Sequence, residues 1–240
     1  MPRLHAAREA ALAGALRLVS LSYPLSPSSP VYPGNEPVQV SPVSSIAAGD
    51  AANVYRLTTL NHNGSHVDAP RHFNPEGPAA EELPLTTFVF DRPLVVDVAT
   101  PPGGMLTGEA LRGVVRPGDG ADLLLVRTGS GALRDRDPVT YAERDVSLHP
   151  SAARYVADEL PSVRAIGLDS ISAGSPLHRE EGREAHRILT GCGRTDGRFV
   201  LIYEDLRLPP DLPRLRRVWA LPLVVLGTDS APVVVVAEVD

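Results

Sequence analysis

The chain has 240 residues, of which 43% are hydrophobic and 22% are charged, and this is enough for one domain with a sizeable core. The net charge of −6 argues against a nucleic-acid surface, since phosphate binding needs a positive field. All 23 basic residues are arginine, which excludes a Schiff-base lysine and the lysine of a phosphate-binding P-loop. The single cysteine, Cys192, excludes an intramolecular disulfide and a cysteine-based zinc site.

The N-terminal residues favour a helical extension over residues 1–17, ahead of one domain over residues 18–240. Leu4, Leu12 and Leu16 recur there at helical spacing. Glu9 and Arg17 bracket only seven residues, against about 7–15 for the apolar region of a secretion signal, so we expect no secretion and a cytoplasmic location. No stretch approaches the roughly 20 apolar residues of a membrane helix, so no membrane partner is expected.

Short strands are expected to dominate the fold. The 24 prolines and 20 glycines are spread along the chain, which disfavours long helices. Apolar and β-branched runs predict strands at residues 17–21, 54–60, 88–98, 121–128, 165–168, 199–204, 220–226 and 233–239. Of these, residues 54–60 are typical of a half-buried strand. Helices are predicted at residues 107–114, 151–159 and 180–189. We therefore predict an α/β fold with a single β-rich domain, a mixed sheet core and few short helices.

The most unusual local feature is a histidine cluster. Three of the seven histidines fall within 11 residues. The potential metal ligands of this segment all have even numbers: His62, His66, Asp68 and His72. In extended chain they would share one face, and imidazole with carboxylate suits zinc, manganese or iron. The alternative is an Asn-Gly hairpin turn at Asn63 and Gly64, flanked by surface histidines.

The same segment resembles a known family signature. Its sequence, HNGSHVDAPRHF, is similar to the HxGTHxDxPxHF pattern of the metal-dependent cyclase family, which includes bacterial kynurenine formamidase and isatin hydrolase. Further segments agree in order, among them SPVYPGNEP near the N-terminus and FVLIYEDL late in the chain. The resemblance covers residues 18–239. It implies the swivelling β/β/α fold of that family and a homo-oligomer, either a dimer or a tetramer.

The resemblance also implies a metal site. The implied metal ligands are His62, His66, Asp68, His186 and Glu204. The first three would bind one ion, and Asp68 would bind a second ion together with the last two. Zn²⁺ is the implied cofactor, as one or two ions, with Mn²⁺ as the alternative. His72 would be the catalytic acid/base.

The residues themselves leave alternatives for the two distant ligands. Glu204 ends an apolar run, where an acid at a strand edge would be unremarkable. His186 lies on a charged helix, where a solvated histidine is the usual case, and the nearby His178 competes for its role. Asp169, which follows a short apolar strand, is expected to be structural or to hold a histidine in the right tautomer.

Two departures from the family pattern concern the substrate. The family threonine is Ser65 here, which keeps the hydroxyl, and the aromatic residue of the N-terminal loop is Tyr32, where formamidases commonly have tryptophan. We expect both Tyr32 and Ser65 to contribute to substrate binding.

The function that the resemblance implies is metal-dependent hydrolysis of a small-molecule aryl amide. An N-formyl aryl amide such as N-formylkynurenine is the leading substrate. The alternatives are a ring-opening lactam hydrolase of the isatin type, a natural-product cyclase or dehydratase, and a catalytically idle metal-binding protein. The complete set of candidate ligands argues against the idle protein. The absence of a G-x-S-x-G sequence leaves a serine-hydrolase mechanism without support.

Overall fold

The computed structural model describes residues 17–240. The strands are β1 Arg17–Ser20, β2 Gln39–Ser44, β3 Val54–Thr58, β4 His66–Asp68, β5 Val89–Phe90, β6 Pro93–Asp97, β7 Met105–Leu106, β8 Leu123–Arg127, β9 Ser147–Leu148, β10 Ala165–Leu168, β11 Leu201–Glu204, β12 Leu215–Pro222 and β13 Ala231–Val239. The α-helices are α2 Gly108–Arg112, α3 Gly131–Arg134, α4 Pro138–Glu143, α5 Pro150–Arg154 and α6 Arg179–Leu189. No helix in residues 17–240 is long and apolar enough to cross a membrane.

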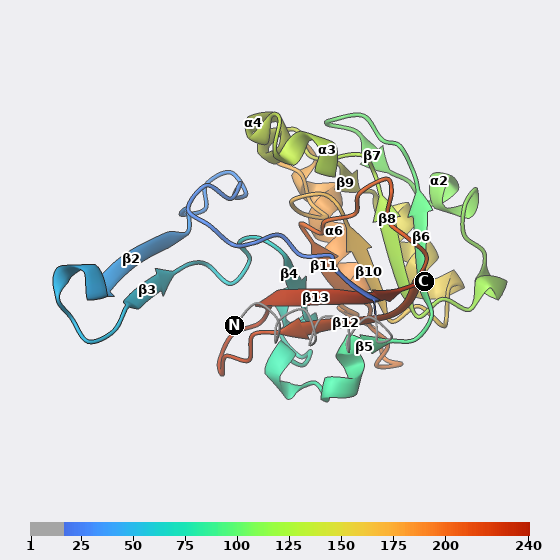
Figure 1. Ribbon diagram of the computed structural model, residues 1–240. Coiled ribbons are helices and arrows are strands. Elements are labelled where there is room, and N and C mark those ends of the chain that lie inside the picture. The colour runs from blue at the N-terminus through green and yellow to red at the C-terminus, as the bar shows by residue number, and fades with distance from the viewer. Residues whose placement is uncertain (1–16) are drawn as a thin grey trace.

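A large mixed sheet forms the centre of the molecule (Figure 1). Its strand order is β5-β12-β13-β4-β11-β10-β8-β6, and β1 pairs with β13. Four neighbouring strands, β11, β10, β8 and β6, pair in parallel. The other strands of the order, β4, β13, β12 and β5, pair antiparallel with their neighbours. Strand β6 also contacts β12 from the other half of the order, so the sheet curls back on itself. The predicted β-rich domain with a mixed sheet and few short helices is confirmed.

Two cores lie on the two faces of this sheet because side chains alternate along each strand. In β8, Leu123 and Leu125 belong to the inner core with Phe90, on the concave face. Leu124 and Val126 belong to the outer core, which α5 and α6 cover. A strand with apolar residues on both faces reads as a continuous apolar run, which is why β8 was predictable.

The alternation also decides where polar groups can gather. In β4, Val67 packs in the inner core, and in β11, Tyr203 does the same. The residues on either side of them, His66, Asp68 and Glu204, therefore point to the opposite face, toward α6. A candidate polar site thus lies between the middle of the sheet and one helix.

Several predicted elements need correction. The predicted strand at residues 220–226 is instead β12, which begins at Leu215 and ends at Pro222. The predicted helix at residues 151–159 is α5 followed by a π-helical turn, Tyr155–Glu159. Short elements with little periodicity, β2, α3 and α4, were not predicted. The predicted extension over residues 1–17 lies outside the described residues except for Arg17, which begins β1.

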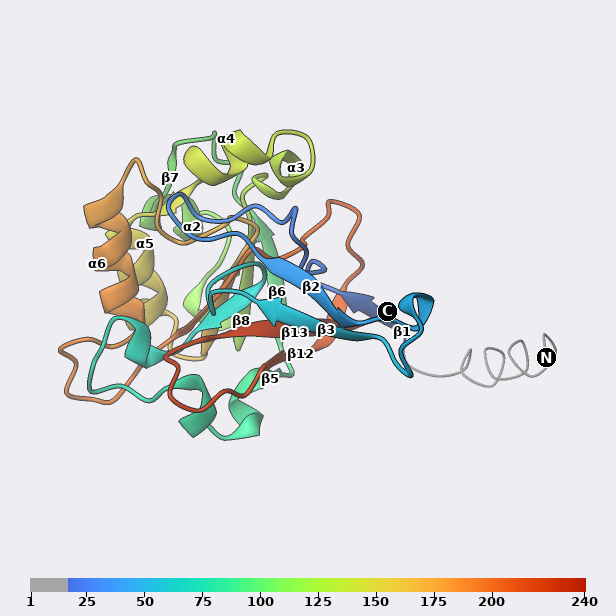
Figure 2. The same ribbon diagram turned by 90° about the vertical axis from the view of Figure 1, so that its left-hand side faces the viewer.

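Strands β2 and β3 form a separate two-stranded hairpin. In Figure 1 this hairpin projects away from the main sheet, and in Figure 2 it points toward the viewer and lies in front of the sheet. Every residue of β3 is exposed, so the prediction of a half-buried strand at residues 54–60 is wrong within this chain.

Candidate metal centre

The pairing of β4 with β11 builds the centre of the site. His66 and Glu204 are direct cross-strand partners, and Asp68 lies two residues along β4 on the same face. His66 Nε2 lies 3.2 Å from Glu204 Oε2 and 3.4 Å from Asp68 Oδ1. All three side chains are buried. Strand register thus brings an acid from late in the chain to the early histidine cluster.

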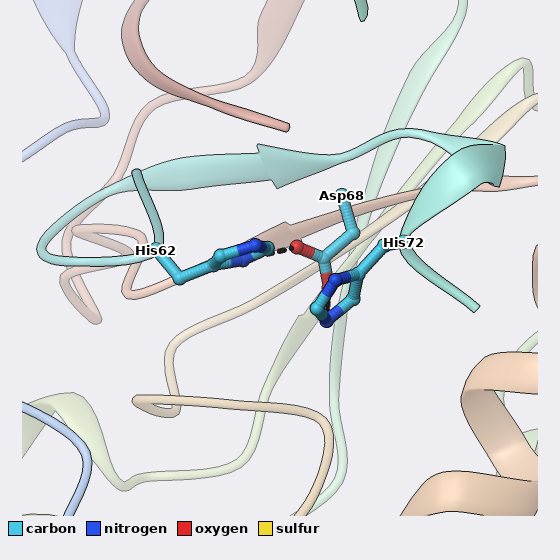
Figure 3. Close-up of side chains that lie close together, drawn as sticks. All are labelled: His62, Asp68 and His72. Carbon is cyan, nitrogen blue, oxygen red and sulfur yellow. Dashed lines mark ion pairs between the residues drawn. The ribbon is translucent and has the colours of Figure 1, made fainter. Parts of the chain in front are cut away.

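His62 and His72 lie on either side of the Asp68 carboxylate (Figure 3). His62 comes from the turn before β4, and His72 ends the 3-10 helix Pro70–His72. His62 Nδ1 is 3.0 Å from Asp68 Oδ1, and His72 Nε2 is 4.0 Å from Asp68 Oδ2. The four even-numbered residues do converge, but extended chain accounts only for His66 and Asp68. A turn and a short helix position the other two.

The fifth predicted ligand, His186, reaches the cluster from α6. Its Nε2 atom lies 3.5 Å from Asp68 Oδ2 and 3.3 Å from Glu204 Oε1. The competing His178 precedes α6, and its Nε2 lies 2.9 Å from the carbonyl oxygen of Gly103. The structure therefore brings His186, and not His178, to the site.

Backbone carbonyls fix which nitrogen each buried histidine presents. His66 Nδ1 is 2.8 Å from the Gly64 oxygen, and His186 Nδ1 is 2.6 Å from the Gly182 oxygen. Because a carbonyl can only accept, each Nδ1 carries the hydrogen. Each Nε2 then faces the carboxylates as a potential ligand atom.

The loop after β10 donates two hydrogen bonds to one carboxylate oxygen of Glu204. The backbone N–H of Ala173 donates to Glu204 Oε1 at 2.5 Å, and the Ser172 hydroxyl donates to the same oxygen at 3.2 Å. This leaves Oε2 directed at His66. The carboxylate is therefore oriented by its own chain and not only by the histidines.

Asp229 is a site residue that the sequence analysis missed. Its Oδ2 atom lies 2.7 Å from His72 Nδ1 and 3.0 Å from His62 Nε2. Its Oδ1 accepts a hydrogen bond of 2.7 Å from Asn61 Nδ2. Asp229 stands in the loop before β13, far from the cluster in sequence, so no local pattern marked it. The histidine-holding carboxylate is thus Asp229.

Asp169, which was expected to be structural or to hold a histidine, has the structural role. Its carboxylate accepts hydrogen bonds from the backbone of Thr128, Gly129 and Gly131. These contacts fix the turn after β8. Within residues 17–240, no histidine forms a hydrogen bond with this carboxylate.

Opposing charges shift the pKa values of the cluster. Burial lowers the pKa of His62, but the neighbouring carboxylates of Asp229 and Asp68 outweigh this effect and raise the pKa to about 9. Burial likewise opposes the charged form of His186, but the neighbouring carboxylates of Asp68 and Glu204 raise its pKa to about 10. Burial and Asp68 act to raise the pKa of Glu204, but His186 and His66 bring it down to about 2. The buried carboxylates thus stabilise positive charge in their midst.

The donor set fits a divalent cation. His66 Nε2 and both oxygens of Asp68 are buried without a hydrogen-bond partner, a costly state that a bound cation would relieve. Two groups have ligand atoms within 4.8 Å of one another: His62, Asp68 and His72, and His66, Asp68 and Glu204. Asp68 belongs to both groups, but the groups differ from the predicted division, which placed His62 with His66 and Glu204 with His186. His72 lies close enough to be a ligand as well as an acid/base.

A cavity of about 320 Å³ opens beside this cluster. Its lining residues are Tyr32, Asn35, His62, His66, His72, Phe73, Ile171, Ser172, Gly174, Ser175, Arg179, Gly182, Arg183, His186 and Glu204. The ring of Phe73 stacks on that of His186 with centroids 4.7 Å apart. The cavity therefore combines aromatic walls with the candidate ligands, which suits a small aryl compound.

The two predicted substrate-binding residues lie in different places. Tyr32 lines the cavity. Ser65 is buried, and its hydroxyl donates to the Asp205 carbonyl oxygen at 2.5 Å and accepts from the Tyr23 N–H at 3.0 Å. The Ser65 hydroxyl therefore joins three chain segments behind the site.

Comparisons with known proteins identify the relatives of this chain. The family model described as "Putative cyclase" matches residues 19–175. The chain is 29% identical over 226 residues to a protein named kynurenine formamidase from Salinibacter ruber (strain DSM 13855 / M31), covering 91% of this chain and 95% of that protein. It is 30% identical over 218 residues to a protein of the same name from Geobacillus thermodenitrificans (strain NG80-2), covering 90% and 94%. The solved structure of isatin hydrolase A from Labrenzia aggregata, bound to benzyl benzoate, superposes with a TM-score of 0.75 at 22% identity and covers 99% of both chains.

Proposed function

Because this chain belongs to the cyclase family, we propose that it is a metal-dependent hydrolase that cleaves the C–N bond of an aryl amide. The leading substrate is an N-formyl aryl amide such as N-formylkynurenine. The observation that carries the proposal is the buried cluster of His66, Asp68 and Glu204, which opens on a cavity next to His72. The relatives named kynurenine formamidase support the choice of substrate class.

The residues that would hold the cation are His62, His66, Asp68, His186 and Glu204. We propose Zn²⁺, as one or two ions, with Mn²⁺ as the alternative, since imidazole and carboxylate ligands suit both. When bound, such a cation supplies a Lewis acid that polarises a carbonyl group and lowers the pKa of water.

The protein's own contribution to proton transfer centres on His72. The carboxylate of Asp229 accepts from Nδ1–H of His72, which leaves Nε2 as the basic nitrogen on the side of Asp68 and the cavity. That nitrogen can remove a proton from the attacking water and return it to the departing amine nitrogen. Such general acid–base catalysis contributes roughly 10²–10⁴-fold.

The cavity walls hold the substrate for this transfer. Tyr32 and Phe73 offer aromatic surfaces and Ile171 an aliphatic one, so an aryl ring can pack there while its amide faces His72. Burial of the ring also keeps bulk water away from the reacting groups.

The direct test is formate release from N-formylkynurenine by metal-stripped protein reloaded with Zn²⁺ or Mn²⁺. We expect release only with added metal. If the protein opened the isatin ring but released no formate from N-formylkynurenine, the substrate would be a lactam. The assignment as a metal-dependent hydrolase would still hold. Bound metal without turnover of any amide would favour the idle metal-binding protein.

Two variants separate ligand from catalyst. His66→Ala should lose metal, measured by elemental analysis, because a buried ligand is removed. His72→Ala should keep its metal and lose roughly 10²–10⁴-fold in turnover. His178→Ala is the control, since its ring faces Gly103, and should keep both properties. If His72→Ala lost metal as His66→Ala does, His72 would be a ligand.

A further inference from the structure

We propose that Arg179 and Arg183 bind an anionic group of the substrate, so that the natural substrate is an aryl amide that carries a carboxylate. This inference rests on the proposed function and narrows its substrate class. Both arginines line the cavity that contains His72 and the candidate metal ligands.

The geometry of α6 places these arginines in one row with His186. Positions 179, 182, 183 and 186 share a face of an α-helix, because residues three or four apart are neighbours on its surface. At about 1.5 Å of rise per residue, Arg183 lies about 4.5 Å and Arg179 about 10.5 Å along the axis from His186. A substrate whose amide lies at His186 and His72 would therefore reach the arginines with a group a few bonds away.

Gly182 keeps this row of residues close to the rest of the cavity lining. It lies between Arg179 and Arg183 on the helix face and packs directly on Gly174, another lining residue. A Cβ atom at position 182 would lie 2.6 Å from the Gly174 Cα atom, so a side chain there would push the helix and its arginines away. The close packing therefore keeps both arginines in the same cavity lining as His186.

The guanidinium groups are available to a ligand. Within residues 17–240, no acidic side chain forms a salt bridge with Arg179. Arg183 pairs with Glu180 at 2.7 Å, but both side chains are more than half exposed, and such a pair is worth little. The guanidinium has five N–H donors, so this pair leaves most of them unused.

The cavity lining contains two arginines and one carboxylate, that of Glu204. Both oxygens of Glu204 already face histidines or backbone and hydroxyl donors, and neither forms an ion pair with an arginine. Burial raises the pKa of the Tyr32 hydroxyl across the cavity, the charges of Arg179 and Arg183 act to lower it, and the charge of Glu204 acts to raise it. A local positive field in a chain of net charge −6 suits a bound anion.

The test compares two substrates that differ only by the carboxylate: N-formylanthranilate and formanilide. The variants are Arg179→Gln, Arg183→Gln and their combination. Arg187→Gln is the matched control, because Arg187 is an exposed arginine of the same helix that does not line the cavity. Each assay measures kcat and KM of the metal-loaded enzyme.

We expect each cavity variant to lose about tenfold or more in kcat/KM for N-formylanthranilate, mainly through KM, since a charged hydrogen-bond partner is lost. Formanilide hydrolysis should stay within about twofold, because it lacks the anion, and Arg187→Gln should change neither substrate. Equal losses for both substrates, or wild-type enzyme that hydrolyses formanilide as efficiently as N-formylanthranilate, would overturn the assignment.

A binding measurement keeps this inference separate from the hydrolase proposal. Calorimetric titration with anthranilate requires no turnover. If neither formyl compound is hydrolysed with Zn²⁺ or Mn²⁺, the proposed formamide hydrolysis fails. The arginine site is still supported if anthranilate binds wild-type protein and not the double variant, and it is refuted if both bind anthranilate equally.

Discussion

At the scale of single residues, Asp229 joins two histidines through one oxygen atom. Its Oδ2 accepts from His72 Nδ1 and His62 Nε2, so it fixes the tautomer of both rings. An asparagine has the same shape but offers an amide N–H₂ in place of one acceptor oxygen. We expect Asp229→Asn to lower kcat by roughly 10–100-fold, the usual cost of losing such a partner.

The control for this variant is Asp211→Asn, at an exposed acid in the loop before β12. It should leave kcat unchanged. The measurement is steady-state turnover of the metal-loaded proteins, with metal content determined in parallel. Full activity in Asp229→Asn would show that the histidines are oriented by other groups.

A second feature at the scale of single residues is the buried ion pair between Arg134 and Asp205, the residue that follows Glu204. Asp205 has a positive φ of 51°, and its carboxylate accepts from Arg134 at 2.7 and 2.9 Å and from the Tyr141 hydroxyl at 2.6 Å. All three side chains are buried. Arg134→Met would leave the Asp205 charge buried without its cation, which typically costs about 3–5 kcal/mol.

We therefore expect urea unfolding of Arg134→Met to show a free energy of unfolding lower by about 3 kcal/mol or more. Arg136→Met, at an exposed arginine of the same segment, is the control and should change it by less than about 0.5 kcal/mol. Equal stability of the two variants would mean that the buried pair is dispensable.

At the scale of elements, the position of α6 sets the position of His186. A Cβ atom at Gly182 would lie 2.6 Å from the Gly174 Cα atom, closer than real contacts allow. Gly182→Ala should therefore push α6 away from the loop that also holds Glu204. We expect metal affinity to fall about tenfold or more, measured by competition with a chelator, because one ligand is displaced.

The control for the helix shift is Gly118→Ala, where a Cβ atom would meet no atom within 4 Å. Its metal affinity should equal that of the wild type. If Gly182→Ala also binds metal like the wild type, α6 tolerates the displacement and His186 is not a necessary ligand.

The elements that were predictable from the sequence are those whose pattern is local. Strands β8 and β11 carry apolar residues on both faces, and α6 has a single apolar side with Ala185 and Leu189. The histidine cluster was likewise visible because its members are close in sequence. By contrast, the pairing of His66 with Glu204 depends on strand register, and only the family resemblance suggested it. Asp229 was missed because its contacts to His62 and His72 span more than 150 residues.

At the scale of the whole molecule, the β2–β3 hairpin has an unpartnered apolar face. The cross-strand pairs Val40 with Leu57 and Pro42 with Tyr55 lie on one face, and Ser41 pairs with Arg56 on the other. A two-stranded hairpin is marginally stable by itself, and contiguous exposed apolar groups mark interaction surfaces. Because the family resemblance implies a homo-oligomer, we expect a second copy of the chain to cover this face.

Analytical ultracentrifugation tests this proposal. The wild type should sediment as a dimer or tetramer, and Leu57→Glu should shift it toward the monomer because it places a charge on the apolar face. Arg56→Glu, on the opposite face of the same strand, should keep the oligomer. A monomeric wild type, or an intact oligomer in Leu57→Glu, would refute the role of the hairpin.

The stability of the molecule in alkali should depend on tyrosines that are partly or fully buried. The chain contains no lysine, so few side chains titrate near pH 10. Burial, aided by the charge of Asp205, raises the pKa of the Tyr23 hydroxyl from 10.0 to about 12. Below pH 10 this hydroxyl is protonated in both states. Between pH 10 and 12 the unfolded chain releases a proton that the folded chain retains, so the free energy of unfolding falls as the pH rises.

Urea unfolding of the wild type and of Tyr23→Phe from pH 7 to 11.5 measures this effect. The two proteins should show parallel stability between pH 7 and 9, where contributions from the raised histidine pKa values are the same in both and cancel in the difference. Above pH 10 the wild type should lose stability faster, because the phenylalanine ring of the variant has no hydroxyl proton to release. Buried Tyr141, whose pKa is also raised by burial, should continue the decline in both proteins. Curves that stay parallel to pH 11.5 would show that Tyr23 titrates alike in the folded and unfolded chains.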